Sequence, residues 1–162
     1  MSAVSADIVV ESELWSAHPQ TEATVRAAIT AAASHSTQSG EVSILLTDDS
    51  SVRELNRQWR GLDKPTNVLS FPAPKTAAGF LGDIVIAYET LSRESTDEDR
   101  DFLHHLTHLT VHGFLHLIGY DHQTDAQADA MEGLESKIMT AMNMPDPWQD
   151  PARTRDLETG SA

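Results

Sequence analysis

The chain has 162 residues, which suffices for one ordinary domain, and its lack of cysteine excludes disulfides, thiolate metal ligands and a cysteine nucleophile. The net charge of −14 argues against a general nucleic-acid-binding protein, because an acidic surface repels a polyanion. We find no apolar run of about 18 residues and no basic segment leading into an apolar run at residues 1–10, so we expect a cytoplasmic protein without a membrane span or a signal peptide.

The N-terminal half alternates short apolar runs with segments of helical spacing. Apolar residues at every third or fourth position indicate helices, and short apolar runs bounded by glycine, proline or acidic residues indicate strands. These patterns predict strands at 7–10, 42–46, 67–71 and 81–88, and helices at 21–34 and 52–59. Residues 39–40 are expected to break the first helix, and residues 47–49 to form a turn and cap before the second helix.

One basic stretch interrupts the acidic chain at residues 51–75, where five basic residues stand against two acids. Arg60 lies within it, just before a glycine, and its guanidinium can bind a phosphate through two parallel hydrogen bonds. Lys64 follows in the loop and Ser70 in the next strand, so both are candidates for the same substrate-binding cleft. The alternative is a solvated helix, loop and strand that bind nothing.

The C-terminal half is predicted to contain two helices. Residues 95–98 (S-T-D-E) can start a long helix that runs to about residue 118, because hydroxyl and acidic side chains favour a first turn. A last helix is expected at 124–142, before two prolines. We therefore predict one α+β domain at residues 1–145, with a small mixed sheet of about four strands against about five helices, the long helix central, and a mobile tail at 146–162.

The long helix carries the pattern H-x₃-H-x₂-G-x₂-H at residues 112–122. His112 and His116 are four residues apart, so their imidazoles share one helix face. Gly119 can end the helix in a left-handed conformation and return His122 to the same point. Three neutral nitrogen ligands with one open position are typical of a catalytic zinc site. We therefore predict that His112, His116 and His122 bind one Zn²⁺ ion.

Three further histidines lie on the same predicted helix. His108 and His116 are separated by about 12 Å along the helix axis, so they cannot both contact one ion. The glycine turn favours the two histidines nearer to it, which leaves His108 one turn away, either behind the ligands or facing the substrate. His104 and His105 are expected at the surface.

The spacing matches the long zinc motif of metzincin proteases, in which a glutamate after the first histidine is the general base. Here that position is Gly113, which can neither accept a proton nor orient water. Peptide hydrolysis by that route is disfavoured, and water activation is left to the metal alone or to a base from elsewhere. Asp121 and Asp83 are the candidate bases, although each also has a structural explanation as a turn residue or a strand-end residue.

Three blocks of this sequence resemble the YbeY family of endoribonucleases, which are rRNA maturation factors. The blocks are H-x₃-H-G-F-L-H-L-I-G-Y-D-H at 108–122, N-x₂-W-R-G-L-D-K-P-T-N-V-L-S-F-P at 56–72 and L-G-D-I-V-I at 81–86, and the resemblance covers about residues 5–144. One departure is Asn67, where we expect the family pattern to have aspartate. If that carboxylate serves catalysis, the activity is altered here; if it only caps a turn, asparagine serves equally.

The resemblance implies a metal-dependent endoribonuclease that cuts single strands in rRNA processing, notably at the 3′ end of the small-subunit rRNA, and acts in ribosome quality control. It implies that His112, His116 and His122 hold the metal, usually zinc, and that Arg60 is the key basic residue. The ion would activate water and polarise a phosphoryl oxygen while Arg60 stabilises the added negative charge; either water or the ribose 2′-OH attacks. The expected partners are rRNA, the small ribosomal subunit, and ribosomal proteins or an assembly GTPase.

Two other functions stay open at the level of sequence. One is a metal-dependent hydrolase of another substrate, such as a peptide, against which Gly113 argues. The other is a ribosome assembly factor with a structural metal; structural sites usually have four protein ligands, and His108 would have to move to supply the fourth. The acidic charge also predicts weak affinity for free RNA, so that ribosomal partners select the substrate.

Overall fold

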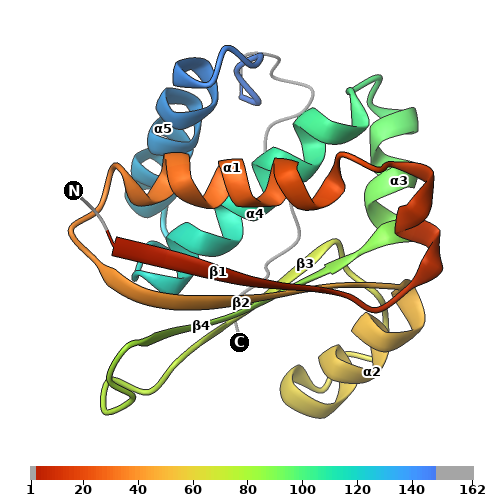
Figure 1. Ribbon diagram of the computed structural model, residues 1–162, viewed down its shortest axis with the longest axis horizontal. Helices are drawn as coiled ribbons and strands as arrows, with labels where there is room; N and C mark the ends of the chain where they lie inside the picture. The colour runs from red at the N-terminus through yellow and green to blue at the C-terminus, as the bar shows by residue number, and fades with distance from the viewer. Residues whose placement is uncertain (1–2, 149–162) are drawn as a thin grey trace.

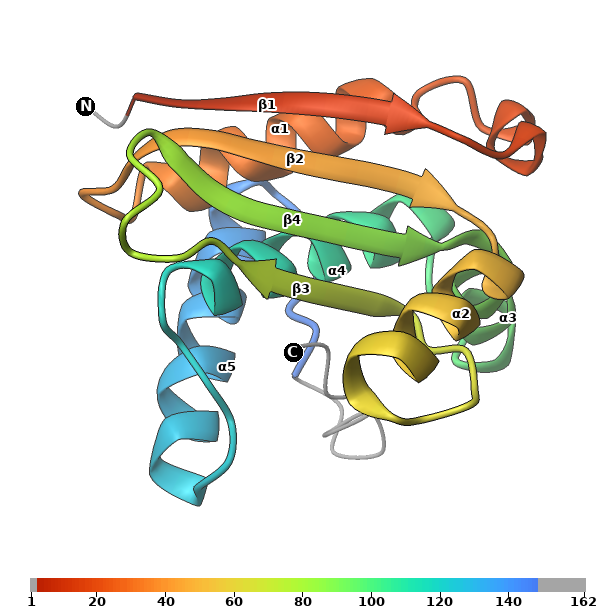
Figure 2. The same cartoon turned by 90° about the horizontal axis from the view of Figure 1, so that it is seen from below.

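Four strands form one mixed sheet in the computed structural model, which describes residues 3–148 (Figure 1). They are β1 (Ala3–Val10), β2 (Ser39–Thr47), β3 (Val68–Pro72) and β4 (Phe80–Ala87). The order across the sheet is β1-β2-β4-β3, with β1, β2 and β4 parallel and β3 antiparallel to β4 at one edge (Figure 2). The small mixed sheet predicted from the apolar runs is confirmed.

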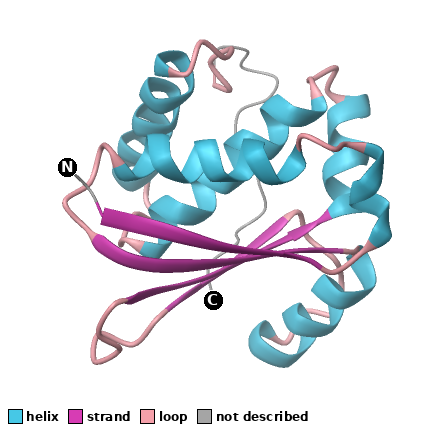
Figure 3. Cartoon of the chain, in the orientation of Figure 1, coloured by secondary structure: helices cyan, strands magenta, loops and turns pink. Residues whose placement is uncertain are grey.

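The helices lie on both sides of this sheet (Figure 3). On one side stand α1 (Thr21–Ala33), α4 (Phe102–Leu117) and α5 (Asp125–Ala141), and on the other stands α2 (Asp49–Arg60). The fifth helix, α3 (Tyr88–Asp97), continues directly from β4 and packs against α4. A short 3₁₀ helix, η1 (Glu13–Ala17), was not predicted; it buries Trp15. The expected α+β arrangement with about five helices is confirmed.

Alternation along β4 explains why both faces of the sheet are covered. Ile84 and Ile86 belong to the main core, which includes residues of α1 and α4. Val85 and Ala87 point the other way and pack with Val52 of α2. Because burying a large aliphatic side chain contributes about 1.5–3 kcal/mol, both faces stabilise the position of this strand.

The central helix is α4, as predicted. Every residue from His105 to Leu117 is buried. The helix contacts α1, α3, α5, β3 and β4, so protein surrounds it over this length. Polar side chains on α4 consequently need partners inside the protein.

The single long helix predicted to start at residues 95–98 is wrong, because the structure has two helices there. Ser95 lies within α3, where its hydroxyl donates to a carbonyl one turn earlier at 2.9 Å. Asp99 has a φ of 53°, a left-handed conformation that a helix cannot continue through. Asp101 then caps α4 by accepting the His104 backbone N–H at 3.1 Å. The acidic residues therefore separate two helices instead of starting one.

Other boundaries differ by smaller amounts, two of them with a clear reason. Residues 39–40, predicted as a break after the first helix, belong to β2, where Gly40 pairs with Val4 of β1. The helix itself already ends at Ala33. Tyr88, predicted at the end of a strand, is the first residue of α3. In both places the strand pairing decides where the elements begin and end.

The tail predicted at 146–162 begins with residues that contact the domain. Asp146 accepts hydrogen bonds from the Ser136 hydroxyl at 2.6 Å and from the Trp148 backbone N–H at 2.9 Å. The remainder, residues 149–162, lies outside the described residues, so its mobility stays a prediction. Among the described residues, no helix is long and apolar enough to cross a membrane.

Candidate metal centre

Three histidines meet at the C-terminal end of α4. His112 and His116 lie one turn apart on this helix. Gly119 follows with a φ of 111°, a value that glycine adopts without strain, and its N–H donates to the His116 carbonyl at 3.1 Å. The chain then turns back, so that the ring of His122 lies 5.5 Å from that of His112 and 5.0 Å from that of His116. We call His112, His116 and His122 the histidine triad.

The histidine triad presents three bare nitrogen atoms to one point. Each of the three residues offers one ligand atom, and these atoms all lie within 4.8 Å of one another. The Nε2 atoms of all three rings are buried and have no hydrogen-bond partner. Leaving three acceptors unpaired in the interior costs free energy unless something fills the space between them. A metal ion with nitrogen ligands fits this arrangement.

Burial keeps His116 and His122 in the form that binds metals. Desolvation, followed by the neighbouring charges of His112 and His122, lowers the pKa of His116 to about 4. The pKa of His122 is also lowered, chiefly by burial and then by His112. Both rings are therefore neutral at physiological pH, and a neutral imidazole nitrogen has the free electron pair that a metal requires.

A buried carboxylate, Glu135 of α5, stands behind the triad. His112 Nδ1 lies 2.7 Å from one of its oxygens, and His108 Nε2 lies 2.7 Å from the other. Trp148 Nε1 donates to that second oxygen at 2.8 Å. Burial alone would raise the pKa of Glu135, but the two imidazoles outweigh it and hold the pKa below its usual range. The carboxylate is therefore ionised and accepts all three hydrogen bonds.

Glu135 is a functional candidate that the sequence analysis missed. Met131 and Ile138, apolar residues of the same helix, are both buried. Glu135 lies four residues after Met131, and therefore on the same stripe of the helix. An acidic residue on an apolar stripe is the signal that could have identified it, because a buried charge needs partners.

The other histidines of α4 differ from one another. His108 is only 1% exposed and faces Glu135, so it lies behind the triad rather than toward solvent. The predicted surface position of His105 is wrong: this residue is 2% exposed, and its Nε2 lies 2.8 Å from Glu94 of α3. His104 is half-buried near the start of the helix. The surface prediction fails for His105 because α3 packs against α4 at this point.

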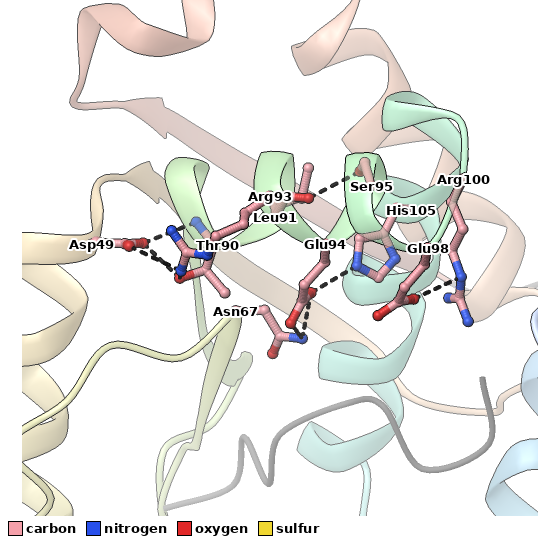
Figure 4. A network of polar contacts seen from close by, with 10 residues as sticks. All are labelled: Asp49, Asn67, Thr90, Leu91, Arg93, Glu94, Ser95, Glu98, Arg100 and His105. Atoms are coloured by element: carbon pink, nitrogen blue, oxygen red, sulfur yellow. Dashed lines mark hydrogen bonds and ion pairs between the residues drawn. The ribbon is translucent and has the colours of Figure 1, made fainter. Parts of the chain in front are cut away.

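Asn67 belongs to a polar network at the other end of α4 (Figure 4). Its side-chain amide donates to the two oxygens of Glu94 at 3.1 and 3.3 Å. Glu94 also receives the hydrogen bond of His105, so one carboxylate joins the start of β3 to α3 and α4. Asn67 is fully buried. Its side chain donates its hydrogen bonds to Glu94 rather than to the histidine triad.

Gly113 faces the sheet instead of the triad. A Cβ atom at this position would lie 2.9 Å from Ile84 Cγ2 and 3.2 Å from Ser70 Oγ. The Ser70 hydroxyl donates to the Gly113 carbonyl at 3.3 Å, and Ser70 is fully buried. The missing protease glutamate is therefore explained by packing, because the helix approaches β3 and β4 too closely for a side chain. Ser70 lies under the helix, where its hydroxyl is directed at α4.

The predicted basic residues belong to a different helix and loop from the triad. Arg60 is half-buried in the last turn of α2, a helix that stands on the other side of the sheet from α4 (Figure 1). Lys64 is exposed in the loop that follows. Arg53 and Arg57 of the same helix form ion pairs with acidic neighbours, which reduces the local positive charge. The joint action of Arg60 with the histidine triad therefore stays a prediction.

The two candidate bases lie on opposite sides of the sheet. Asp83 lines a groove with Trp59 and Phe71 on the α2 side, so the prediction that it could serve the triad as a base is wrong. Burial raises the pKa of Asp83, against the opposing effect of a hydrogen bond with Ser43. Asp121 directly precedes the last triad histidine and accepts its backbone N–H at 2.8 Å. Of the two, only Asp121 is beside the triad.

Comparisons with known proteins agree on one family. The sequence profile described as Endoribonuclease YbeY matches residues 9–143. A protein of that name from Rhodopseudomonas palustris (strain BisA53) is 50% identical over 157 residues, covering 91% of each chain. Another, from Nitrobacter hamburgensis, is 53% identical over 153 residues, covering 88% of this chain and 80% of that one. The solution structure of a Thermotoga maritima protein has the same fold, with a TM-score of 0.57, 20% identity, and coverage of 90% of this chain and 100% of that one.

Proposed function

The chain belongs to the endoribonuclease YbeY family, and we propose that it is a metal-dependent endoribonuclease that cuts single-stranded RNA. Its place is in rRNA processing, at the 3′ end of the small-subunit rRNA, and in ribosome quality control. The observation that carries the proposal is the histidine triad, whose three buried Nε2 atoms converge without a partner. A site of this kind in a chain with endoribonuclease relatives supports hydrolysis of a phosphodiester bond.

In this proposal the triad holds one Zn²⁺ ion. Three neutral nitrogen donors suit zinc, whereas magnesium and calcium take oxygen ligands. When bound, the ion supplies a Lewis acid that lowers the pKa of water and polarises a phosphoryl oxygen. The chain supplies the geometry: α4 fixes His112 and His116, and the turn at Gly119 delivers His122.

Arg60 and Lys64 bind phosphate groups of the substrate in this proposal. The planar guanidinium of Arg60 matches a phosphate in shape and charge. As the reacting phosphate gains negative charge, that cation stabilises it. Asp121, which directly precedes His122, is the candidate in this proposal for accepting a proton from the attacking water or 2′-OH. Ser70 and His108, also candidates for substrate binding, make their hydrogen bonds inside the protein instead.

Two alternatives are less well supported. A metzincin-like peptidase needs a glutamate at position 113, where the packing of α4 on the sheet leaves no room for one. A non-catalytic assembly factor with a structural metal needs a fourth ligand. The cluster of possible ligands found among residues 3–148 contains three, and His108 is held by Glu135.

The acidic net charge supports a role for ribosomal partners in presenting the RNA substrate. With a net charge of −14, the free protein is expected to bind naked RNA weakly at physiological salt. We propose that the small ribosomal subunit presents the rRNA, with ribosomal proteins or an assembly GTPase as further contacts, in the cytoplasm. Tight binding of naked RNA by the isolated protein in physiological salt would contradict this part of the proposal.

The test combines metal analysis with RNA cleavage. Wild-type protein is expected to contain one zinc ion per chain and to cut single-stranded RNA but not casein. His116→Ala should lose both the metal and the cleavage activity, because one of three ligands is gone. Arg60→Ala should keep the metal and lose cleavage by a factor of about 100 or more, the usual cost of removing a group that stabilises transition-state charge.

Arg57→Ala is the matched control for Arg60→Ala. Arg57 stands on the same helix, is exposed, and forms an ion pair with Glu54. Its removal deletes an equal charge and should leave cleavage nearly unchanged. If Arg60→Ala retained full activity, the assignment of Arg60 to the phosphate would be wrong; casein cleavage without RNA cleavage would favour the peptidase.

A further inference from the structure

Glu135 is a fully buried carboxylate that contacts the triad through His112. Its exposed fraction is 0%, and its ion-pair partners among the described residues are His108 and His112. Its oxygens accept hydrogen bonds from two imidazoles and one indole, at 2.7–2.8 Å. Burying an ionised group among neutral rings is costly, and those three hydrogen bonds offset the cost.

The geometry fixes the position of one proton. An ionised carboxylate can only accept hydrogen bonds, so the His112 nitrogen that faces it, Nδ1, must carry a hydrogen. A neutral imidazole carries one such hydrogen, which leaves Nε2 of His112 bare. That Nε2 is the atom found buried and without a partner inside the triad. Glu135 thus holds His112 in the tautomer that can bind a metal.

Trp148 determines which oxygen of Glu135 serves which partner. An indole N–H can donate but cannot accept, and it occupies the same oxygen as His108. The other oxygen is left to His112. Trp148 also packs edge-on against the ring of His108, with centroids 5.6 Å apart, so its position is doubly constrained.

We propose that Glu135 is a positioning residue that keeps the metal-binding nitrogen of His112 unprotonated, and that Trp148 fixes the orientation in which it does so. The inference rests on the proposed role of the histidine triad as a metal site. Neither residue touches the ion or the substrate in this assignment; both act through His112. Carboxylates that orient metal-binding histidines typically change metal affinity by about 10–100-fold when they are removed.

The variant Glu135→Gln tests the positioning role, because it replaces only one carboxylate oxygen by an NH₂ group. The indole and His108 both donate, so the amide oxygen of the glutamine must face them. Its NH₂ group then faces His112 Nδ1, which has to accept a hydrogen bond and give up its hydrogen. The proton moves to Nε2 and blocks the ligand atom. We expect zinc affinity to fall by about 10–100-fold, measured by competition with a chelator.

A second readout does not depend on the metal. In metal-free wild-type protein, long-range nitrogen–proton NMR spectra should show His112 protonated at Nδ1 and bare at Nε2. In Glu135→Gln the pattern at His112 should be reversed. A residue that merely supports the fold would lower stability without exchanging the two nitrogens. Circular dichroism and thermal unfolding establish that the variant is folded.

Combining Trp148→Phe with Glu135→Gln tests the role of the indole. Without the indole N–H, the glutamine amide can rotate and offer its oxygen to His112, while His108 adopts its other tautomer. The double variant Glu135→Gln/Trp148→Phe should therefore bind zinc more tightly than Glu135→Gln alone, although each single change is unfavourable or neutral. Asp129→Asn is the matched control, because it removes the same charge from the exposed face of α5 and should leave zinc affinity unchanged.

The outcomes separate this inference from the proposed function. If Glu135→Gln binds zinc as wild type does and His112 keeps its Nδ1 hydrogen, the positioning role is wrong while the metal site stands. If wild-type protein does not bind zinc, the metal assignment is wrong, and the NMR spectra of the metal-free protein still decide the tautomer. A double variant no better than Glu135→Gln would overturn the role of Trp148.

Discussion

At the scale of single residues, Gly113 shows how packing and chemistry compete for one position. The helix that presents the triad lies so close to the sheet that a Cβ at this residue would come within 2.9 Å of Ile84. A protease glutamate is thus excluded by the fold that creates the site. The helix can therefore supply metal-binding histidines but not the general base that metzincin proteases carry on the same helix.

Substitution of Gly113 should destabilise the protein. Gly113→Ala forces Ile84 and Ser70 to move, which is expected to cost about 1–3 kcal/mol in urea unfolding. Gly133→Ala is the control, because its added methyl group would meet nothing within 4 Å; it should be neutral or stabilising by up to about 1 kcal/mol. Equal stability of the two variants would show that α4 has more room against the sheet than the structure gives it.

The triad also makes the stability of the metal-free protein depend on pH. The pKa of His116 is about 4 in the folded protein and 6.5 ordinarily, so between these values the unfolded chain binds a proton that the folded chain does not. Stability is then complete above pH 6.5 and is lost as the pH falls toward 4. Urea unfolding at pH 7 and pH 5 should differ by about 2 kcal/mol from this residue. In His116→Gln the difference should shrink; an unchanged difference would assign it to other groups.

At the scale of elements, the Asn67 network determines how β3, α3 and α4 are joined (Figure 4). Glu94 accepts from the Asn67 amide and faces His105, so a single carboxylate on α3 contacts both neighbours. Asparagine at position 67 is a donor where aspartate could only repel Glu94. The departure from the expected family pattern therefore suits the contacts of this chain.

Asn67→Asp should destabilise the protein at neutral pH. Two carboxylates would face each other in a buried place, at a cost of about 1–3 kcal/mol. Protonation of one of them should relieve the effect, so the loss should decrease as the pH is lowered. Glu94→Gln in the same chain should restore stability, because aspartate then has an amide partner. A destabilisation that Glu94→Gln leaves unchanged would place its cause outside this pair.

At the same scale, the positions of strands could be predicted better than the ends of helices. Apolar runs located all four strands, because strand residues such as Ile84 and Val85 are buried on both faces of the sheet. The separation of α3 from α4 was missed, since it depends on the left-handed conformation of Asp99 and on which of several acids caps the next helix. Those choices are made by packing between helices, which a single sequence does not display.

At the scale of the whole molecule, the site also contains residues that local sequence reveals and residues that only packing brings together. The triad could be predicted because its three members lie within 11 residues of one another and share one helix and its turn. Glu135 could not be paired with them from spacing, because α5 packs on α4 only in the folded chain. The side of the sheet that carries Asp83 also depends on register, which pairs Asp83 with Ser43 of β2.

Metal removal should weaken the fold without abolishing it. The main core joins α1, α4, α5 and the sheet through apolar residues that need no ligand. A metal present at 100 times its dissociation constant contributes about 2.7 kcal/mol, which corresponds to a Tm change of about 5–10 °C in a chain of this size. Calorimetry with and without a chelator measures the shift. Complete unfolding on chelation would show that the ion is part of the core.

The burial of α4 has a kinetic consequence for the site. His112 and His116 stand on a helix enclosed from His105 to Leu117, so they move only when the core opens. His122 is half-buried on the loop beyond Gly119, which gives it freedom that the other two lack. We therefore expect a bound ion to enter and leave by movement of His122, while His112 and His116 remain in place. The residence time of that ion should then depend mainly on the mobility of residues 118–122, which follow the end of α4.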